Sequence, residues 1–294
     1  MTTHGTTIEW VVALAESRGM RADVWNPVAG CLPVGEGCRN CWAATEAALR
    51  ESNQRVAPFY AGLTRRTEDG RVVFNGRTRF LPEELQKPLR AKRPTVYFVC
   101  SRADLFGEGV LDGWIDQVFA AMARSPQHLF LTLTKRPQRM RPFTPSLLLP
   151  NVWLGVSVWD QDSADKFIPA LANTPAAKRF ISAEPLLGPI LLPPAHRVDW
   201  VIAGGESGRR PRPMHPEWSR SLRDQCSDGA IPYFFKQWGE WSPALPPEQD
   251  SWEAHRQRGG KNYHVFPDGV AMDLLGKKRA GRMLDSREWQ EMPR

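Results

Sequence analysis

No run of apolar residues in this chain approaches the roughly 18–20 that a membrane-spanning helix needs. The first ten residues also lack the basic start and apolar stretch of a secretory signal. We therefore expect a cytoplasmic protein with no membrane partner. Internal repeats, heptads and low-complexity tracts are missing as well, and the length of 294 residues suits one large α/β domain.

Cysteine is scarce and unevenly placed. The chain has five cysteines, an odd number, and in a reducing compartment they do not form a disulfide framework. Cys100 and Cys226 stand alone and are expected to be buried thiols, whereas Cys31, Cys38 and Cys41 follow the spacing C-x6-C-x2-C. Glycines within and beside this segment permit the tight turns that aim several thiolates at one centre. The three clustered cysteines are therefore a candidate metal site.

Thiolates are ligands of zinc and of iron–sulfur clusters. A structural zinc ion needs four ligands, and the nearest candidates for a fourth, His4 and Cys100, are remote in sequence. Three thiolates leave one iron of a [4Fe-4S] cluster open, where S-adenosylmethionine chelates through its amino and carboxylate groups. We predict Cys31, Cys38 and Cys41 as ligands of such a cluster. An open zinc site and three cysteines without metal remain alternatives, because C-x3-C-x2-C is the commoner spacing for this chemistry.

Short apolar runs alternate with helical stretches along most of the chain. The expected strands are 95–100, 128–134, 151–157, 178–182, 199–203 and 231–235, with a first strand within 21–30. The expected helices are 111–124, 164–172 and 216–226. Continuous apolar runs are typical of parallel strands covered on both faces. The sequence thus predicts an α/β fold, a full or partial parallel (β/α) barrel over residues 1–242, followed by an irregular extension over residues 243–294 that packs on the barrel.

Polar residues follow each expected strand, and in parallel α/β folds the carboxyl ends of the strands carry the site. Ser101 and Asp104 are candidates for binding the methionine ammonium of S-adenosylmethionine, with helix capping as the alternative. Lys135 or Arg136 is the candidate partner of its carboxylate, with a surface charge as the alternative. All four positions belong to the predicted cofactor end of the barrel.

Further polar residues at strand ends are candidates for substrate binding and chemistry. Ser157 and Glu184 are placed for a ribose hydroxyl of the cofactor, and a carboxylate after a buried strand needs a partner. We predict Cys100, Glu184 and Lys236 as catalytic residues, with Cys100 as the candidate hydrogen-atom donor.

Basic residues outnumber acidic ones, giving a net charge of +7 that favours a polyanionic partner. The predicted phosphate-binding residues are Arg209, Arg210, Arg212, Lys277 and Lys278. A solvated basic surface is the alternative. In the same region we interpret Gly204-Gly-Glu206 as a substrate loop or a turn, and His215 as a helix cap.

Several short motifs occur in order along the chain. They are Trp25-Asn-Pro-Val-Ala-Gly-Cys31, Gly37-Cys38-Arg-Asn-Cys41, Ala103-Asp-Leu-Phe106, Leu133-Thr-Lys-Arg-Pro137, Ser182-Ala-Glu-Pro-Leu-Leu-Gly188, Gly204-Gly-Glu-Ser-Gly208 and Phe234-Phe-Lys-Gln-Trp-Gly239. Together they resemble the phage three-Cys-motif family, long catalogued as a domain of unknown function, over about residues 25–289. The chain departs from the family at two places. The family joins its Ile-Glu-Trp start, here Ile8-Glu9-Trp10, closely to Trp-Asn-Pro, whereas Val11–Asp23 intervenes in this chain. The second departure is Trp42, where a Tyr is more usual.

The resemblance implies a barrel of the radical S-adenosylmethionine type, from a family of phages and bacteria whose relatives are linked to hypermodified thymines in phage DNA. In such enzymes a 5′-deoxyadenosyl radical removes a hydrogen atom from the substrate. We expect an isomerase, or secondly a lyase, acting on a modified nucleobase in DNA or a nucleotide, in the host cytoplasm if a phage encodes it. The expected electron donor is a reductase or a flavodoxin-type protein. The alternatives are a zinc-containing nucleic-acid-binding protein without catalysis, and a radical enzyme acting on a peptide or small molecule.

Overall fold

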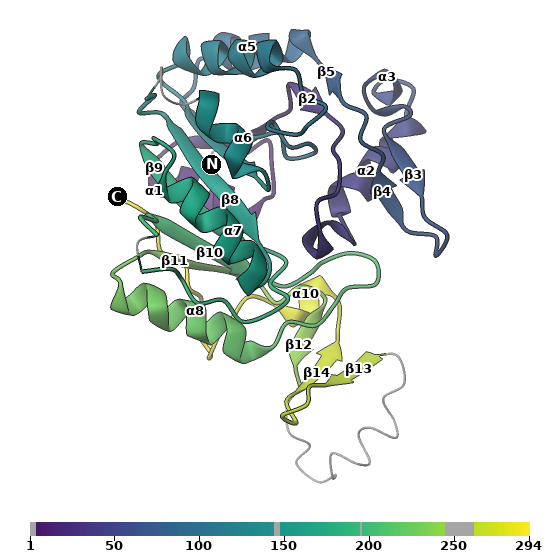
Figure 1. Cartoon of the computed structure of the whole chain (residues 1–294), viewed down its shortest axis with the longest axis vertical. Coiled ribbons are helices and arrows are strands. Elements are labelled where there is room, and N and C mark those ends of the chain that lie inside the picture. Colours follow the sequence, from purple (N-terminus) through teal and green to yellow (C-terminus); the bar gives the residue numbers. More distant parts are fainter. Residues whose placement is uncertain (1–3, 144–147, 195, 245–261) are drawn as a thin grey trace.

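The computed structural model describes residues 4–143, 148–194, 196–244 and 262–294, and its centre is one seven-stranded sheet (Figure 1). The strands are β1 (Arg21–Trp25), β6 (Thr95–Val99), β7 (Leu129–Thr134), β8 (Val152–Val158), β9 (Lys178–Ala183), β10 (Trp200–Gly204) and β11 (Tyr233–Gln237). Neighbours follow chain order and pair in parallel, and β1 and β11 form the two edges. The sheet is an open, curled half-barrel, which confirms the predicted parallel α/β fold in its partial form.

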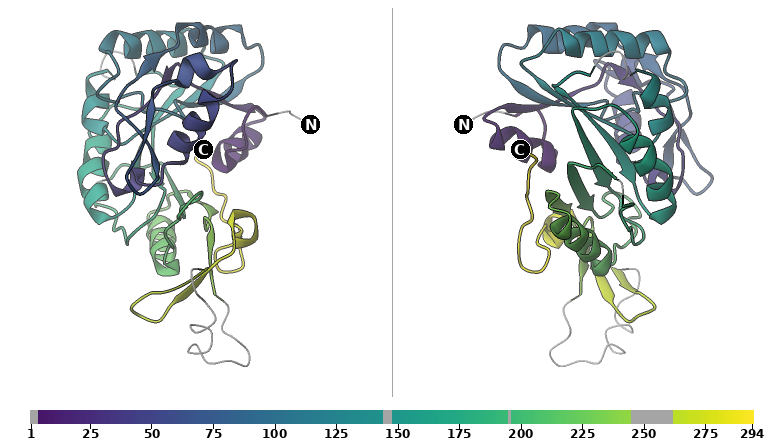
Figure 2. Two further views of the ribbon diagram at one scale, coloured as in Figure 1. Left: turned by 90° about the vertical axis from the view of Figure 1, so that its right-hand side faces the viewer. Right: turned by 60° about the vertical axis from the view of Figure 1, so that its left-hand side comes forward.

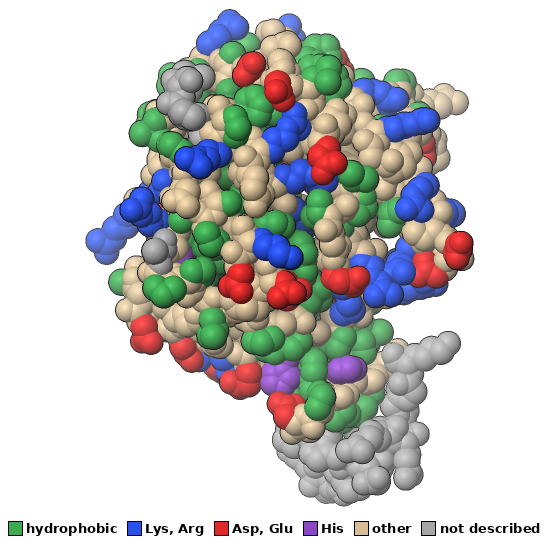
Figure 3. All heavy atoms as spheres, viewed as in Figure 1, with side chains coloured by type: hydrophobic (Ala, Val, Ile, Leu, Met, Phe, Trp, Pro, Cys, Tyr) green, Lys and Arg blue, Asp and Glu red, His purple; other side chains and the backbone are tan. Residues whose placement is uncertain are grey.

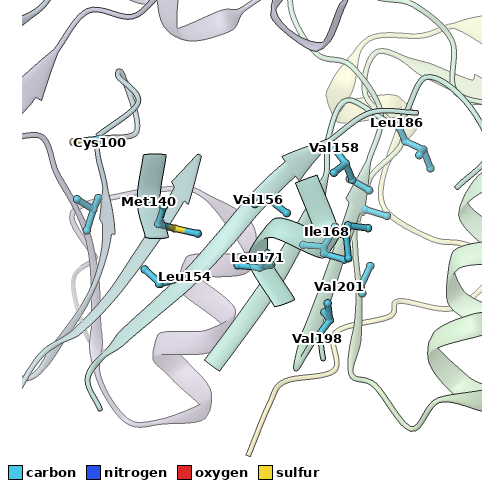
Figure 4. Close-up of a cluster of buried hydrophobic side chains, with 14 of the residues drawn as sticks. Cys100, Met140, Leu154, Val156, Val158, Ile168, Leu171, Leu186, Val198 and Val201 are labelled. Atoms are coloured by element: carbon cyan, nitrogen blue, oxygen red, sulfur yellow. The ribbon is translucent and has the colours of Figure 1, made fainter. Parts of the chain in front are cut away.

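Helices cover the outer face of this half-barrel. They are α5 (Asp112–Ala123), α6 (Pro137–Met140), α7 (Gln161–Ala172) and α8 (Pro216–Asp228), with the 3₁₀ turn η3 (Arg141–Phe143) after α6. The three stretches predicted as helical are thereby confirmed. Figure 4 shows part of the buried cluster between these layers, where Ile168 and Leu171 of α7 lie beside Val156 of β8. Both faces of the strands are apolar because the face turned away from these helices is covered as well.

The helix α1 (Glu9–Ser17) covers the concave face. Figure 2 shows it on the opposite side of the sheet from α5 and α7. Trp10 is buried there, with its ring centroid 5.0 Å from that of Phe98 and 5.8 Å from that of Trp200. The helix contacts β1 and β6 near one edge of the sheet and β11 at the other. One short helix reaches both edges because the sheet is curled around it.

An insertion (residues 26–94) separates β1 from β6 and carries the three clustered cysteines. Its elements are β2 (Val28–Ala29), η1 (Glu36–Cys38), α2 (Trp42–Glu51), α3 (Ala57–Tyr60), β3 (Thr64–Arg66), β4 (Val72–Phe74), β5 (Arg79–Phe80), η2 (Pro82–Leu85) and α4 (Gln86–Arg90). Ala44, Ala47, Leu63 and Phe74 belong to a small buried core of its own. The insertion therefore packs as a distinct layer beside the half-barrel (Figure 1).

The C-terminal extension holds more regular structure than its composition indicated. A three-stranded antiparallel sheet is formed by β12 (Trp241–Pro243), β13 (Tyr263–Val265) and β14 (Ala271–Leu274), and the short helix α10 (Lys277–Ala280) follows. The last residues return to the half-barrel, where the Phe235 amide donates to the carbonyl of Trp289. No helix among the described residues is long and apolar enough to span a membrane.

His128 makes the stability of the half-barrel depend on pH. Its ring is buried, the Thr95 amide donates to Nδ1 at 3.1 Å, and Nε2 lies 3.0 Å from the carbonyl of Pro88. Burial lowers the pKa of His128 below its ordinary value. His128 therefore binds a proton more readily in the unfolded chain than in the folded one. The contribution of its neutral, buried ring to stability is complete above the unfolded pKa of about 6.5 and is lost as the pH falls.

We expect the melting temperature to fall between pH 7.5 and pH 5.5, and to fall less in His128→Gln, whose side chain does not titrate. Thermal unfolding followed by circular dichroism at both pH values measures the difference. The same pH dependence in both proteins would show that protonation of His128 is not the cause.

Candidate active site

One cavity of about 520 Å³ opens at the carboxyl ends of the strands. We call it the central cavity. Its walls come from the start of α1, the cysteine segment, the loops after β6 to β11, and α10. The predicted residues that line it are Cys31, Cys38, Cys41, Cys100, Ser101, Asp104, Lys135, Ser157, Glu184, Lys236 and Lys277. Residues scattered over the sequence are thus brought to one place by the parallel topology.

The cysteine segment is shaped by glycines. Gly30 has a φ of 88°, and a Cβ atom there would meet the carbonyl oxygen of Arg77 at 2.2 Å. Gly35 and Gly37 lie against the indole of Trp159, at the end of β8, so closely that a Cβ atom at either would come within 3 Å of the ring. The segment can therefore lie flat against the end of the half-barrel only with glycine at these positions.

The three thiols share the central cavity without meeting at a point. Within the described residues, no three His, Cys, Asp or Glu side chains converge closely enough to hold a single metal ion. A [4Fe-4S] cluster requires a different arrangement, because each thiolate binds a separate iron atom and the three sulfur atoms lie around the cluster. The three cysteines line one cavity, which is compatible with ligation of this kind.

The surroundings of the thiols differ. Burial raises the pKa of Cys31 to about 12, and the negative charge of Asp104 adds to the increase. Burial also raises the pKa of Cys41, but the amides of Ala44 and Ala43 and the ammonium of Lys135 act in the opposite direction. Cys41 is the N-cap of α2, where helix amides favour a thiolate. The protein thus already presents N–H groups and a cation to one of the expected ligands.

Two networks of hydrogen bonds and ion pairs, which we call clamps, hold the segment that carries Cys31, Cys38 and Cys41 in place. The Arg136 guanidinium donates to the Asp104 carboxylate at 3.2 Å and to the carbonyl of Leu32 at 2.8 Å. Glu206 is buried and accepts from Asn40, between Cys38 and Cys41, at 3.0 Å. The sequence left Gly204-Gly-Glu206 as a substrate loop or a turn, and the structure makes its carboxylate an anchor for the segment.

Arg212 completes the second clamp. Its guanidinium donates to Glu206 at 2.6 Å and to the carboxylate of Glu36 at 3.0 Å. The side chain therefore joins the loop after β10 to the cysteine segment. A guanidinium held by two carboxylates is poorly placed to receive a phosphate, so the prediction of phosphate binding rests on Arg209 and Arg210, which are exposed.

Asp104 and Ser101 have protein partners in the cavity wall. The Asp104 carboxylate is buried and accepts hydrogen bonds from the Thr134 hydroxyl at 2.7 Å and from the Lys135 amide at 3.1 Å, in addition to Arg136. The Ser101 hydroxyl donates to the side-chain oxygen of Asn26 at 3.1 Å. Asp104 thus ties the loop after β6 to the end of β7, and no donor to the Ser101 hydroxyl oxygen is found within the described residues, so this oxygen can accept a hydrogen bond.

The lysines of the cavity differ in how they are paired. Lys236 lies 2.5 Å from Glu184, and Lys277 lies 2.7 Å from Glu9. The half-buried Lys135 has no hydrogen-bonded partner for its ammonium within the described residues. Of the two predicted partners for a carboxylate, Arg136 is engaged by Asp104, and Lys135 is the cation that faces the cavity unpaired.

Glu9 is a cavity residue that the sequence analysis missed. Burial raises its pKa, but the charges of Lys236 and Lys277 outweigh this effect and lower it overall. Its signal was present, because Glu9 belongs to the Ile8-Glu9-Trp10 start that precedes the first strand. Lys277 and Lys278, both predicted as phosphate contacts, are exposed on α10, and of the two only Lys277 lines the cavity, beside Glu9.

Three further predictions concern buried groups. Cys100 and Cys226 are buried, as expected for lone thiols. Cys100 lines the cavity, and burial raises the pKa of its thiol well above the ordinary value. Ser157 donates to the backbone carbonyl of Glu184 at 3.2 Å. His215 caps α8 by accepting from the Glu217 amide at 3.1 Å, which confirms its interpretation as a cap.

Residues 6–293 match the model of a family described as a protein of unknown function, DUF5131. The chain belongs to this family. No curated protein matches it in sequence. Among solved structures, it is similar to a mutant spore photoproduct lyase with bound AdoMet and dinucleoside spore photoproduct, with a TM-score of 0.41, 11% identity and coverage of 87% of this chain and 69% of that one.

A spore photoproduct lyase complexed with dinucleoside spore photoproduct has a TM-score of 0.37 at 9% identity, covering 95% of this chain and 74% of that one.

Proposed function

We propose that the chain is a radical S-adenosylmethionine enzyme in which Cys31, Cys38 and Cys41 hold a [4Fe-4S] cluster. The observation that carries this proposal is that three thiols and the ammonium of Lys135 line a single cavity. A cluster bound there would pass one electron, received from a reductase or flavodoxin-type donor, to S-adenosylmethionine and cleave it to methionine and the 5′-deoxyadenosyl radical.

Different residues of the cavity bind different groups of S-adenosylmethionine. Lys135 pairs with the methionine carboxylate, because no carboxylate among the described residues forms an ion pair with its half-buried ammonium. The Ser101 hydroxyl accepts from the methionine ammonium, and Asp104 positions the loop that carries Lys135. Glu184 and Ser157 lie on the walls formed by the following strands and bind the ribose hydroxyls.

The proposed substrate is a modified nucleobase in DNA, which is rearranged by isomerisation or, secondly, cleaved as by a lyase. The net charge of +7 supports a polyanionic substrate. Lys236 and Glu184 face the cavity as a close ion pair, where they can donate a proton to and accept one from the reacting base. Cys100, buried at the end of β6 and lining the same cavity, is the proposed donor of a hydrogen atom to the product radical. The thiyl radical that this leaves is returned to the thiol by a proton and one electron from the same reductase or flavodoxin-type donor.

The proposed function is tested by an anaerobic assay for 5′-deoxyadenosine. The chain is reconstituted with iron and sulfide, reduced with dithionite, and incubated with S-adenosylmethionine. Formation of 5′-deoxyadenosine above the level of the unreconstituted chain is expected. Its absence from a chain that has taken up iron and sulfide would contradict the proposal.

Lys135→Met is expected to raise the KM for S-adenosylmethionine by about tenfold or more, because a charge-assisted hydrogen bond in a sheltered site contributes about 1.5–3 kcal/mol. The matched control is Lys166→Met on the exposed side of α7, which should leave the KM unchanged. Initial rates of 5′-deoxyadenosine formation over a range of S-adenosylmethionine concentrations give both values. An unaltered KM in Lys135→Met would remove this residue from the binding site.

A further inference from the structure

A second hollow of about 520 Å³ lies beside the central cavity, between α2, the β3–β4 hairpin and the loop after β10. We call it the arginine groove, after the side chains that line it: Arg39, Arg66, Arg71, Arg209 and Arg210. Figure 3 shows Lys and Arg side chains gathered on this face between the hairpin and the body of the molecule. Asn40, Trp42 and Gly208 line both hollows, so the groove leads directly to the central cavity.

The charge of the groove is strongly one-sided. One carboxylate, Glu46, lines it with the five arginines, and that carboxylate already accepts from Arg50 at 2.6 Å and Arg102 at 3.2 Å. Neither of these two partners lines the groove. Glu46 therefore does not neutralise the arginines of the groove. Arg39 pairs at 3.4 Å with Glu36, which does not line the groove. The remaining positive charge would be complemented by a chain of anionic groups.

The hairpin supplies one further acid at the edge of the groove. Asp69 forms an ion pair with Arg71 and lies 3.8 Å from Arg210, whose side chain is 62% exposed. Exposed pairs of this kind contribute little to stability, so a phosphate can replace the carboxylate. Arg66 and Arg209 are exposed and have no ion-pair partner within the described residues. These two guanidinium groups are free to bind phosphate.

An exposed tryptophan stands where the groove meets the central cavity. Trp42, the first residue of α2, is 48% exposed, although tryptophan is highly buried on average. Aromatic side chains beside a basic groove are the platforms on which proteins stack bases of single strands. The indole of Trp42 therefore offers a stacking surface for a base at the mouth of the cavity, whereas the arginines offer binding sites for phosphates.

We propose that the arginine groove binds a single DNA strand, with its phosphates on Arg66 and Arg209 and one base stacked on Trp42. The adjacent nucleotide then enters the central cavity, which a base can reach only outside a duplex stack. This inference rests on the proposed function and deepens it, because it names unpaired or extruded DNA as the form of the substrate.

Fluorescence anisotropy of a labelled oligothymidylate tests the groove without reductant or S-adenosylmethionine. Across a salt series, Arg66→Gln and Arg209→Gln should each weaken binding and make the slope of log K against log salt less steep by about 0.7. Arg124→Gln is the matched control, since Arg124 is exposed at the end of α5, on the side of the sheet where β7 begins, whereas the groove adjoins the ends of the strands. It should retain the wild-type affinity and slope.

Trp42→Ala should lower the affinity by about tenfold, as expected for one stacked base, and Trp42→Tyr should restore most of it. Unchanged affinity and slope in both arginine variants would overturn the groove as the strand-binding site. Equal affinity in Trp42→Ala and wild type would overturn the stacked base, and tighter binding of a duplex of the same length would overturn the single strand.

The two proposals fail in different ways. A chain that forms 5′-deoxyadenosine but binds the oligonucleotide equally well in every variant loses the groove and keeps the proposed function. A chain whose binding depends on Arg66, Arg209 and Trp42 but that cleaves no S-adenosylmethionine keeps the groove and loses the proposed function.

Discussion

Cys38→Ala is expected to abolish the formation of 5′-deoxyadenosine and to lower the iron and sulfide retained after reconstitution. Cys38 lies between the other two cysteines in sequence and lines the same cavity. With one of three thiolates removed, a second iron of the cluster loses its protein ligand, and the cluster no longer presents a single open position. Metal analysis and the 5′-deoxyadenosine assay measure the two effects on the same samples.

Cys226→Ala is the matched control, because Cys226 is a buried thiol of α8 that does not line the cavity. It should keep the wild-type iron content and product yield. Full activity in Cys38→Ala would contradict the assignment of the cluster ligands, since no substitution of a ligand in this site should be silent.

Asp104→Ala is expected to destabilise the folded chain by about 3–5 kcal/mol, the usual effect of removing one partner from a buried charge pair. Asp104 is buried with Arg136, and its carboxylate also accepts from Thr134, from the amide of Lys135 and from the amide of Phe106 at 3.0 Å. All of these donors would lose their acceptor at once. Urea unfolding followed by circular dichroism measures the change in free energy.

Asp112→Ala serves as the comparison, because Asp112 pairs with Arg139 at 2.7 Å but its side chain is 73% exposed. Its loss should cost less than about 1 kcal/mol. If the two substitutions have equal effects on the free energy of unfolding, Asp104 does not join the ends of β6 and β7 in the way its contacts indicate.

The half-barrel could be predicted from sequence because its strands are marked by continuous apolar runs. Val96, Phe98 and Leu131 pack toward α1, whereas Tyr97 and Phe130 pack toward the outer helices. Because both faces are covered, apolar and polar residues do not alternate along these strands as they would in a sheet with one exposed face. Such continuous apolar runs are typical of parallel strands. The same topology explains why polar residues placed after successive strands reach one cavity.

The insertion could not be predicted in the same way. Its strands have only two or three residues, too short for an apolar run to stand out. The hairpin did carry a turn signal in Asp69-Gly70, and Gly70 has a φ of 78°. Arg66 and Arg71 flank this turn, and the sequence does not show that the fold places them in one groove with Arg209.

The contacts that clamp the cysteine segment could not be predicted from the sequence either. Glu206 and Asn40 are separated by 166 positions, and neither residue type indicates such a contact by itself. Arg212 appeared equivalent to Arg209 and Arg210 because all three belong to one basic cluster. Burial separates them, since the carboxylate of Glu206 needs a cation and Arg212 is the arginine that reaches it.

The electron paramagnetic resonance spectrum of the reduced, reconstituted chain, recorded before and after addition of S-adenosylmethionine, tests the central claim most directly. Coordination of S-adenosylmethionine to an open iron changes the surroundings of the cluster. The account predicts a [4Fe-4S]⁺ signal whose g values shift on addition and do not shift in Cys38→Ala. A chain that instead holds one tightly bound zinc ion and gives no iron–sulfur signal would contradict it.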